Sequence, residues 1–359
     1  MDQFVIRTYP IEKDKIDNLC KLISSHRLIV PSFEYDFEKE IYDISYYLKI
    51  RDMFQTDVCL LPDRNLLTRW LALYRGEDIK NDNDRLAASI LAFSQLAEIV
   101  IEPSIALYEA AMTNGNVKAN QELNIFRSAD NLDPKYWTAV ALEESDMLPN
   151  IALNDLNKNK LEDINFEMPL RRWRRLYVLV LKIAEIELQG ENSHQCMSEL
   201  FKWMHKDYLM TGTAVILAAH YFAPNNNRKG LFKKLRSLNR ELAIQGIKNA
   251  TWDLFILEEW FSRITTQDKE NKKWLFCTLD KKLKLFAESL IYKKRDVNPL
   301  ESSLINLFGI EIGGKLMEEL KQYRLISSSH ERILNQENNQ PTIASLIEKG
   351  EKIIFNWSV

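Results

Sequence analysis

The sequence predicts an α/β protein that is mostly helical, and three observations lead to this prediction. Glycine and proline number only 10 each in 359 residues, which leaves little material for the many tight turns of an all-β fold. Apolar residues recur at helical spacing through most of the chain. Three short apolar runs, each followed by a polar cap and a helical pattern, predict a parallel sheet with helices on both faces.

The first 55 residues alternate short apolar runs with helical patterns. Between residues 37 and 50, apolar side chains recur at the spacing of one helix face. These side chains are Ile41, Ile44 and Tyr47 or Leu48. The pattern predicts a small α/β or helical layer at the amino terminus.

Residues 57–63 (DVCLLPD) form the first predicted strand. Pro62 ends its short apolar run, and Asp63 follows at the carboxyl end. Aspartate is a favoured helix N-cap, so Asp63 is predicted to cap the helix that begins at residue 64.

Two later segments repeat this pattern of a strand followed by polar residues. Residues 98–104 (EIVIEPS) predict a second strand, after which Ser104 is predicted to cap a helix that carries Glu109 in its second turn. Residues 274–278 (WLFCT) predict a third strand, with Asp280 just past its end.

The rest of the chain is predicted to be mostly helical. Residues 115–165 are polar and weakly periodic, which favours loops with short helices. Residues 169–222 are strongly helical, and a long basic helix is predicted over residues 228–246. Another helix follows, with Asp253 near its start, and the tail from Arg295 is again helical.

The charge is unevenly distributed along the chain. The whole sequence carries −3, from 48 basic and 51 acidic residues. Residues 228–295 contain 17 Lys or Arg against 8 Asp or Glu, a balance of +9, so the remainder carries −12. Such a split indicates a face that binds a polyanion, although solvated helix faces would produce the same count.

Membrane and redox signals point to a cytoplasmic protein. The longest uncharged stretch, residues 208–227, is broken by His220, Pro224 and several asparagines, and the amino terminus lacks the features of a signal peptide. The four cysteines lie far apart without a Cys-x-x-Cys pair, which argues against a zinc ribbon, a thioredoxin-type site or a disulfide framework. Reduced thiols are therefore expected.

Four acids are predicted to converge at one edge of the sheet. Ligands of an open parallel sheet bind outside the carboxyl ends of its strands, where Asp63 and Asp280 are expected. Glu109 and Asp253 are expected near the starts of neighbouring helices. Four carboxylates without matching cations raise one another's pKa, so they need a metal. Oxygen ligands suit Mg²⁺ or Mn²⁺, which in phosphoryl chemistry activates water and stabilises the leaving oxygen.

The ordered set of motifs resembles the PIN-domain nucleases. That family has an Asp ending its first strand, a Glu in a helix after a strand, a later Asp opening a helix, and a Thr-x-Asp closing a strand. The matching residues are Asp63 in LLPDRN, Glu109 in EPSIALYEAA, Asp253 in NATWDLFILEEW, and Thr278 with Asp280 in WLFCTLDKKL. The resemblance implies a metal-dependent endonuclease, most often acting on RNA, in which these four acids are catalytic and hold the metal.

The resemblance also implies a division of the chain. Residues 56–112 and 235–292 would form the PIN-like nuclease core. Residues 113–234 would be a large helical insertion within that core. Residues 1–55 would be an amino-terminal extension, and residues 293–359 a helical carboxyl-terminal extension.

A basic surface is predicted beside the acids. The predicted helix over residues 228–240 carries six Lys or Arg and no acid, and it leads into the helix that bears Asp253. Lysines directly after Asp280 would extend the same face, which would hold the phosphates next to the scissile one. The predicted nucleic-acid-binding residues are Arg228, Lys229, Lys233, Lys234, Arg236, Lys281 and Lys282. Thr278 and Asn65 are predicted to support the acids.

Two further motifs each have a simpler alternative role. RRWRR, residues 171–175, either grips nucleic acid with Trp173 stacked on a base, or forms an amphipathic helix that buries Trp173 and pairs its arginines with acids. GIEIGGK, residues 309–315, has the Gly-x4-Gly-Lys spacing of a phosphate-binding loop, but Leu316 follows where Ser or Thr is required. It is predicted to be a turn into a helix.

The sequence as a whole favours a metal-dependent nuclease that hydrolyses phosphodiester bonds, with RNA preferred over DNA. The alternative is a non-catalytic helical interaction or regulatory protein that keeps a PIN-like core for packing, its acids serving as helix caps and surface groups. A third hypothesis is a toxin or defence effector. The predicted partners are nucleic acid and either an inhibitory protein or a second copy of the chain, with no membrane.

Overall fold

The chain forms two compact units in a computed structural model. The first comprises Met1–Met168 and Glu259–Glu288, and the second comprises Pro169–Glu258 and Ser289–Val359. The structure describes residues 11–33, 38–149, 164–168, 170–190, 192–208, 212–224, 232–267, 269–291, 299–327 and 342–357.

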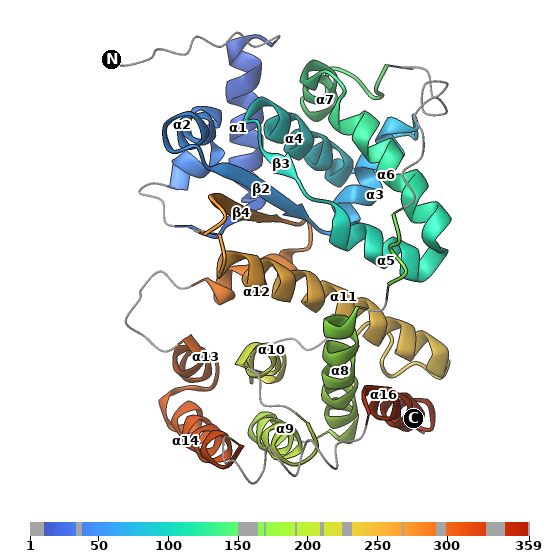
Figure 1. The fold of residues 1–359 in the computed structure, drawn as a ribbon, viewed down its shortest axis with the longest axis vertical. Coiled ribbons are helices and arrows are strands. Elements are labelled where there is room, and N and C mark those ends of the chain that lie inside the picture. The colour runs from blue at the N-terminus through green and yellow to red at the C-terminus, as the bar shows by residue number, and fades with distance from the viewer. Residues whose placement is uncertain are drawn as a thin grey trace. The chain divides into compact units, whose positions relative to one another are not determined.

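A four-stranded sheet lies in the first unit (Figure 1). Its order is β1 (Ile29–Pro31), β4 (Lys272–Cys277), β2 (Asp57–Pro62) and β3 (Val100–Ile101). Strand β2 is parallel to both of its neighbours, whereas β1 is antiparallel to β4. The α/β class and the three strands expected from the sequence are confirmed. The fourth strand, β1, comes from the predicted amino-terminal extension.

Side chains of the central strands pack against both layers that flank the sheet. Leu60 and Leu275 point into one buried cluster. Phe276 packs instead against Trp260 near the end of α11 (Arg240–Ile264), with ring centroids 5.5 Å apart. Burial on both faces explains why these strands have continuous apolar runs rather than alternating patterns.

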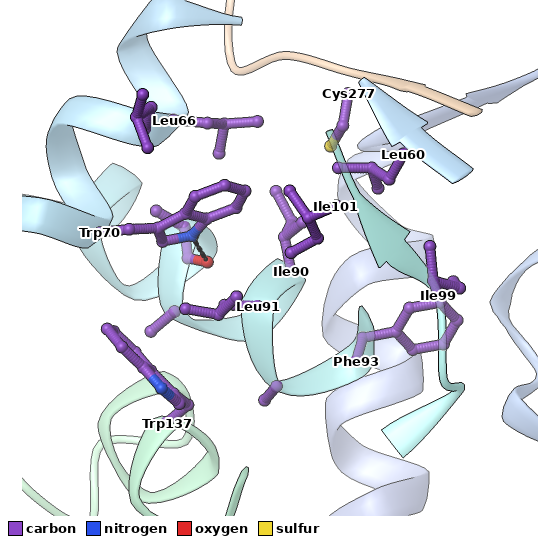
Figure 2. Close-up of a cluster of buried hydrophobic side chains, with 14 of the residues drawn as sticks. Leu60, Leu66, Trp70, Ile90, Leu91, Phe93, Ile99, Ile101, Trp137 and Cys277 are labelled. Atoms are coloured by element: carbon purple, nitrogen blue, oxygen red, sulfur yellow. Dashed lines mark hydrogen bonds between the residues drawn. The ribbon is translucent and has the colours of Figure 1, made fainter. Parts of the chain in front are cut away.

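Helices α3 and α4 build much of the core on one face of the sheet (Figure 2). Trp70 of α3 is fully buried and donates its indole N–H to the carbonyl oxygen of Ala87 in α4, at 2.7 Å. This bond fixes α3, and with it the residue that caps α3, against the sheet. The helices of the unit include α1 (Lys13–His26), α2 (Ile44–Phe54), α3 (Arg64–Tyr74), α4 (Asp82–Leu96), α5 (Ser104–Asn114), α6 (Asn116–Asp130), α7 (Pro134–Ala141) and α12 (Lys281–Leu290), with the short 3-10 helix Glu38–Tyr42.

The described part of the second unit consists of helices joined by turns and contains no strand. Its long helix α11 continues into the first unit. The other helices are α8 (Arg171–Gln189), α9 (Ser193–Asp207), α10 (Gly212–Phe222), α13 (Pro299–Phe308), α14 (Ile310–Ser327) and α16 (Ile343–Phe355). The predicted insertion, residues 113–234, is divided between the units, because α6 and α7 belong to the first and α8 to α10 to the second.

The predicted basic helix over residues 228–246 is wrong over residues 232–239. Residues 232–239 form turns and bends, and α11 begins only at residue 240. Asn239 explains the late start, because its side chain accepts a hydrogen bond from the Glu241 N–H at 3.1 Å, as an N-cap does. Lys234 also adopts the left-handed conformation, with φ 62°, which is incompatible with a continuous right-handed helix.

No helix among the described residues is both long enough and apolar enough to cross a membrane. The four cysteines, Cys20, Cys59, Cys196 and Cys277, are free thiols, as the sequence predicts.

The GIEIGGK motif is a helix contact rather than a turn, which corrects the sequence prediction. Helix α14 begins at Ile310, directly after Gly309, which adopts φ 82°. Gly313 lies against the backbone of α13, where an added Cβ would come within 2.6 Å of the Leu304 carbonyl oxygen. The glycine is therefore required for close helix packing.

Two adjacent glycines of this helix should respond oppositely to alanine. Gly313→Ala is expected to destabilise the protein by about 1–3 kcal/mol, because α13 would have to move. At Gly314 an added Cβ would meet no other atom within 4 Å. Gly314→Ala is therefore expected to stabilise the protein by about 0.5–1 kcal/mol, because alanine favours the helix more than glycine does. Urea unfolding of both variants tests this, and equal effects would contradict the packing role.

Candidate functional site

The carboxyl edge between β2 and β4 is a topological switch point. After β2 the chain continues through α3 and α4 to β3 on one side of β2, whereas β4 lies on the other side. Loops that leave neighbouring strands in opposite directions open a crevice at such a point, where α/β proteins bind their ligands.

Asp63 follows β2 at this edge and is held by several hydrogen bonds. Its Oδ1 accepts from the Leu66 N–H at 2.9 Å, so Asp63 caps α3 as predicted. Its Oδ2 accepts from the Thr278 hydroxyl at 2.5 Å, across 215 residues of sequence. Only 3% of Asp63 is exposed. The Asp63 N–H also donates to the Cys277 carbonyl oxygen at 3.1 Å, which continues the ladder between the two strands.

Asp280 follows β4 on the same edge and is tied to Asp63 through Thr278. The Thr278 Oγ1 accepts from the Asp280 N–H at 3.0 Å while its hydroxyl donates to Asp63. The Oδ1 of Asp280 accepts from the N–H groups of Lys282 and Leu283, at 2.8 and 3.1 Å. Asp280 therefore caps α12, and Thr278 links the two capping carboxylates.

Burial raises the pKa of the Asp63 carboxyl to about 6. Hydrogen bonds from Thr278, Leu66 and the exposed Asn65 side chain act in the opposite direction, and the nearby charge of Asp280 adds to the rise. In the described part of the chain no Lys or Arg forms an ion pair with Asp63. The ionised form is therefore stabilised only by hydrogen bonds and by the amino terminus of α3.

Glu102 is a third acid at the carboxyl edge, and the sequence prediction missed it. It directly follows β3, and its Oε1 accepts from the Ser104 N–H at 3.0 Å. The predicted Ser104 cap is wrong, because Ser104 is already the first residue of α5 and Pro103 occupies the N-cap position. The signal was present in the sequence, since Glu102 follows its strand as Asp63 and Asp280 follow theirs.

Glu109 and Asp253 are placed differently from each other. Glu109 lies in the second turn of α5, in the first unit, and is half-buried. Asp253 lies in the interior of α11, in the second unit, so its predicted place near a helix start is wrong. Among the residues that the structure describes, no group of three or more His, Cys, Asp or Glu is arranged to hold a metal ion.

The predicted basic face is divided between the two units. Lys281 and Lys282 are exposed in the first turn of α12, in the first unit, whereas Lys233 and Lys234 are exposed in turns of the second. Arg236, also in the second unit, donates to the Glu187 carbonyl oxygen at 3.0 Å. The remaining two predicted residues, Arg228 and Lys229, lie outside the described residues.

Arg240, the last cation of that predicted helix, has a structural role. Its guanidinium is buried and donates to the backbone carbonyl oxygens of Leu235, Ser237 and Ile354, at 2.8 to 3.0 Å. It joins the start of α11 to the end of α16. Such a satisfied guanidinium is not available to phosphate.

Comparisons with family models, with curated proteins and with solved structures found no match to this chain. The resemblance to PIN-domain nucleases remains a prediction from four short motifs.

Proposed function

We propose that the carboxyl edge of β2 and β4 hydrolyses phosphodiester bonds with the help of a divalent metal ion. The observation that supports this best is the Thr278 hydroxyl, which joins the carboxylates of two neighbouring strands at the switch point. The acids come from distant parts of the sequence, and the fold brings them to the edge where ligands of α/β sheets bind.

The donors at this edge fit Mg²⁺ or Mn²⁺. Asp63, Asp280, Thr278 and Asn65 offer only hard oxygen ligands, and Mg²⁺ is commonly held by one or two carboxylates together with waters and substrate phosphates. Asp63 and Asp280 would hold the ion. When bound, such an ion lowers the pKa of a water and offsets charge on the phosphate.

The protein's own contribution is positioning. Thr278 uses its hydroxyl proton for Asp63 and its oxygen for the Asp280 N–H, so it restricts the orientation of the Asp63 carboxylate. Lys281 and Lys282, exposed directly after Asp280, are placed to hold neighbouring phosphates. RNA is the preferred substrate in this proposal because the motifs of the chain resemble those of nucleases that act mostly on RNA.

A gel assay tests this function. Purified protein is incubated with labelled single-stranded RNA and DNA, in Mn²⁺, in Mg²⁺ or in chelator. Cleavage is expected only with metal, and Asp63→Asn and Asp280→Asn should each reduce it by at least 100-fold, because groups that act as a unit are not additive. Asp43→Asn is the matched control, since Asp43 caps α2 through the Ser45 N–H and is exposed. Wild-type cleavage by Asp63→Asn or Asp280→Asn would contradict the proposal.

Two more variants separate a two-carboxylate site from the predicted four-acid cluster. The four-acid hypothesis expects Glu109→Gln and Asp253→Asn to abolish cleavage as well. A site built on Asp63 and Asp280 alone expects both variants to retain it. Single-turnover rates of the four variants decide between these two forms of the site.

A second function, that of a non-catalytic interaction protein, is favoured by one observation. Asp63 is almost fully buried, and both of its oxygens accept hydrogen bonds that hold the fold together. Under this alternative the acids are helix caps only. It predicts no cleavage under any condition and a melting temperature that does not respond to Mg²⁺ or Mn²⁺.

A further inference from the structure

Helices α8 and α9 contact each other in the second unit. The chain connects the end of α8 to the start of α9. Near the middle of the two helices, the Lys182 Nζ lies 3.9 Å from the Glu199 Oε1. Just past the end of α9, the Tyr208 hydroxyl donates to the Arg175 carbonyl oxygen at 2.8 Å. The amino terminus of α8 therefore meets the carboxyl terminus of α9.

The carboxyl end of α14 lies beside the same end of α9. The Ser198 hydroxyl donates to Glu319 at 2.7 Å, and the ring centroids of His205 and Tyr323 are 5.0 Å apart. Figure 1 shows these three helices of the second unit together. The ends of α8, α9 and α14 thus form one surface, called the α8–α9 end below.

This surface carries many cations that pair with no carboxylate in the described part of the chain. In unit 1, Arg64 and Arg85 each pair with an acid. At the α8–α9 end, seven side chains make no ion pair with any described carboxylate, and six of them are exposed, Arg174 being half-buried. These seven are Arg171, Arg174, Arg175, Lys202, Lys206, Lys321 and Arg324. The amino terminus of α8 adds a partial positive charge.

Trp173 is not the aromatic group of this surface. It is only 3% exposed and stacks on Tyr177 and Trp252, with ring centroids 5.0 and 5.4 Å apart. Base stacking by Trp173 is therefore excluded, and its burial in an amphipathic helix is confirmed. Among the residues that the structure describes, no carboxylate pairs with Arg171, Arg174 or Arg175, so the accompanying expectation of ion pairs is not met for these three arginines there.

Trp203 supplies an aromatic ring in its place. It lies in the last two turns of α9, among Lys202 and Lys206, and is partly exposed. Its ring stacks on Tyr208 at 5.0 Å between centroids, with an angle of 19° between the planes. Tyr208 is itself fixed by the hydrogen bond to Arg175, so the Trp203 ring is held on a rigid support.

We infer that the α8–α9 end binds single-stranded nucleic acid. Unpaired guanidinium and ammonium groups around a supported, partly exposed indole match a strand whose phosphates need cations and whose unpaired bases need a stacking platform. A duplex would offer its phosphates but keep its bases stacked. This binding does not depend on hydrolysis, since none of the acids at the carboxyl edge takes part.

Fluorescence anisotropy of the full chain in chelator tests the inference. The probes are labelled 15-mers of uridine, of thymidine and of abasic deoxyribose phosphate, titrated over a range of salt concentrations. Changing Arg171, Arg174 and Arg175 together to Gln should weaken binding of uridine and thymidine 15-mers about 10- to 100-fold. It should also flatten the slope of log affinity against log salt by about two, because each phosphate contact on a single strand contributes about 0.7.

The indole has its own test. Trp203→Ala should weaken binding of the uridine and thymidine 15-mers about tenfold and leave the abasic 15-mer unchanged, whereas Trp203→Phe should keep most of the affinity. The two base-bearing strands also show whether RNA or DNA is preferred. Loss of abasic binding in Trp203→Ala would show a structural effect and overturn the stacking role.

A charge-matched control completes the experiment. Lys13, Lys21 and Lys118 are exposed lysines of the first unit, and changing all three to Gln removes the same charge. This control should retain affinity and slope. Equal losses in both triple variants, no loss in the arginine variant, or equal affinity for a duplex or for polyglutamate would each overturn the inference. Because chelator is present throughout, metal-dependent cleavage does not enter these measurements. A failure of the binding inference is therefore distinguishable from a failure of the proposed nuclease function.

Discussion

Asp63→Asn is expected to raise the free energy of unfolding by about 1–3 kcal/mol above pH 6, while it removes the proposed hydrolysis. The carboxylate is buried without a cation, and burial raises its pKa to about 6. The rise from the ordinary value of 3.8 means that ionisation of Asp63 destabilises the folded state by at most about 3 kcal/mol. Asparagine keeps the cap on Leu66 and donates its amide to the Thr278 oxygen, so the charge is lost but the contacts remain.

The pH dependence follows from the direction of the shift. The folded state holds the Asp63 proton more tightly than the unfolded state does, so this group favours folding below about pH 4. That contribution is lost as the pH rises through about 6. In wild-type protein, Asp63 should therefore lower stability across this window, and in Asp63→Asn the loss should be absent.

Urea unfolding of both proteins at several pH values between 4 and 8 measures this effect. Asp43→Asn, the exposed N-cap variant, should change stability by less than about 0.5 kcal/mol at every pH. If Asp63→Asn destabilises the protein at pH 8, the carboxylate contributes more to the fold than its burial costs, and the prediction is wrong.

Arg64→Met is expected to destabilise the protein by about 3 kcal/mol. Arg64 is the first residue of α3, and its guanidinium makes a bidentate pair with Glu122 of α6, at 2.6 and 3.0 Å. Glu122 is only 4% exposed. Removing one partner of such a pair leaves a buried charge without compensation, which costs more than the pair itself contributes.

A double-mutant cycle separates the pair from its parts. Arg64→Met combined with Glu122→Leu should recover most of the lost stability, because an apolar pair needs no compensation. Lys15→Met is the control, since Lys15 pairs with Glu144 at the surface, at 2.8 Å, and should cost less than about 1 kcal/mol. A double variant as unstable as Arg64→Met alone would contradict this account.

Local patterns predicted the strands and caps of the first unit well. The apolar runs within residues 57–63 and 274–278 lie in β2 and β4, because a strand buried on both faces is apolar over its buried length. Asp63 caps α3 as expected, since a cap depends on neighbours only three residues away. Ser104 misled the prediction because α5 already begins at Ser104, whose own N–H donates to Glu102 two residues earlier.

Long-range arrangement was predicted less well. The sequence placed Asp63 and Asp280 at one edge and predicted Thr278 as a supporting group, but it did not show that the Thr278 hydroxyl would bridge the two. Asp253 was expected near the start of a helix, after an earlier helix had ended at Gly246. Instead, one helix, α11, continues through Gly246 and begins more than three turns before Asp253. Glycine is required at position 246 because an added Cβ would clash with the Lys233 carbonyl oxygen.

The basic segments show a similar limit. Periodicity located the helix at RRWRR, but it could not tell that Trp173 would stack inside the second unit and that Trp203, thirty residues later in the next helix, would be the partly exposed ring. Which tryptophan is buried depends on the packing of α8 against α11, and that is not a local property.

Binding of Mn²⁺, followed by electron paramagnetic resonance, tests the proposed site most directly. Wild-type protein at pH 7.5 should bind the ion, and the variant with both Asp63→Asn and Asp280→Asn should not. Lowering the pH should weaken the binding of the ion to wild-type protein, because protons compete with the ion for the Asp63 carboxylate. Equal binding of Mn²⁺ by wild-type protein and by the double variant would contradict a metal site at the carboxyl edge of β2 and β4.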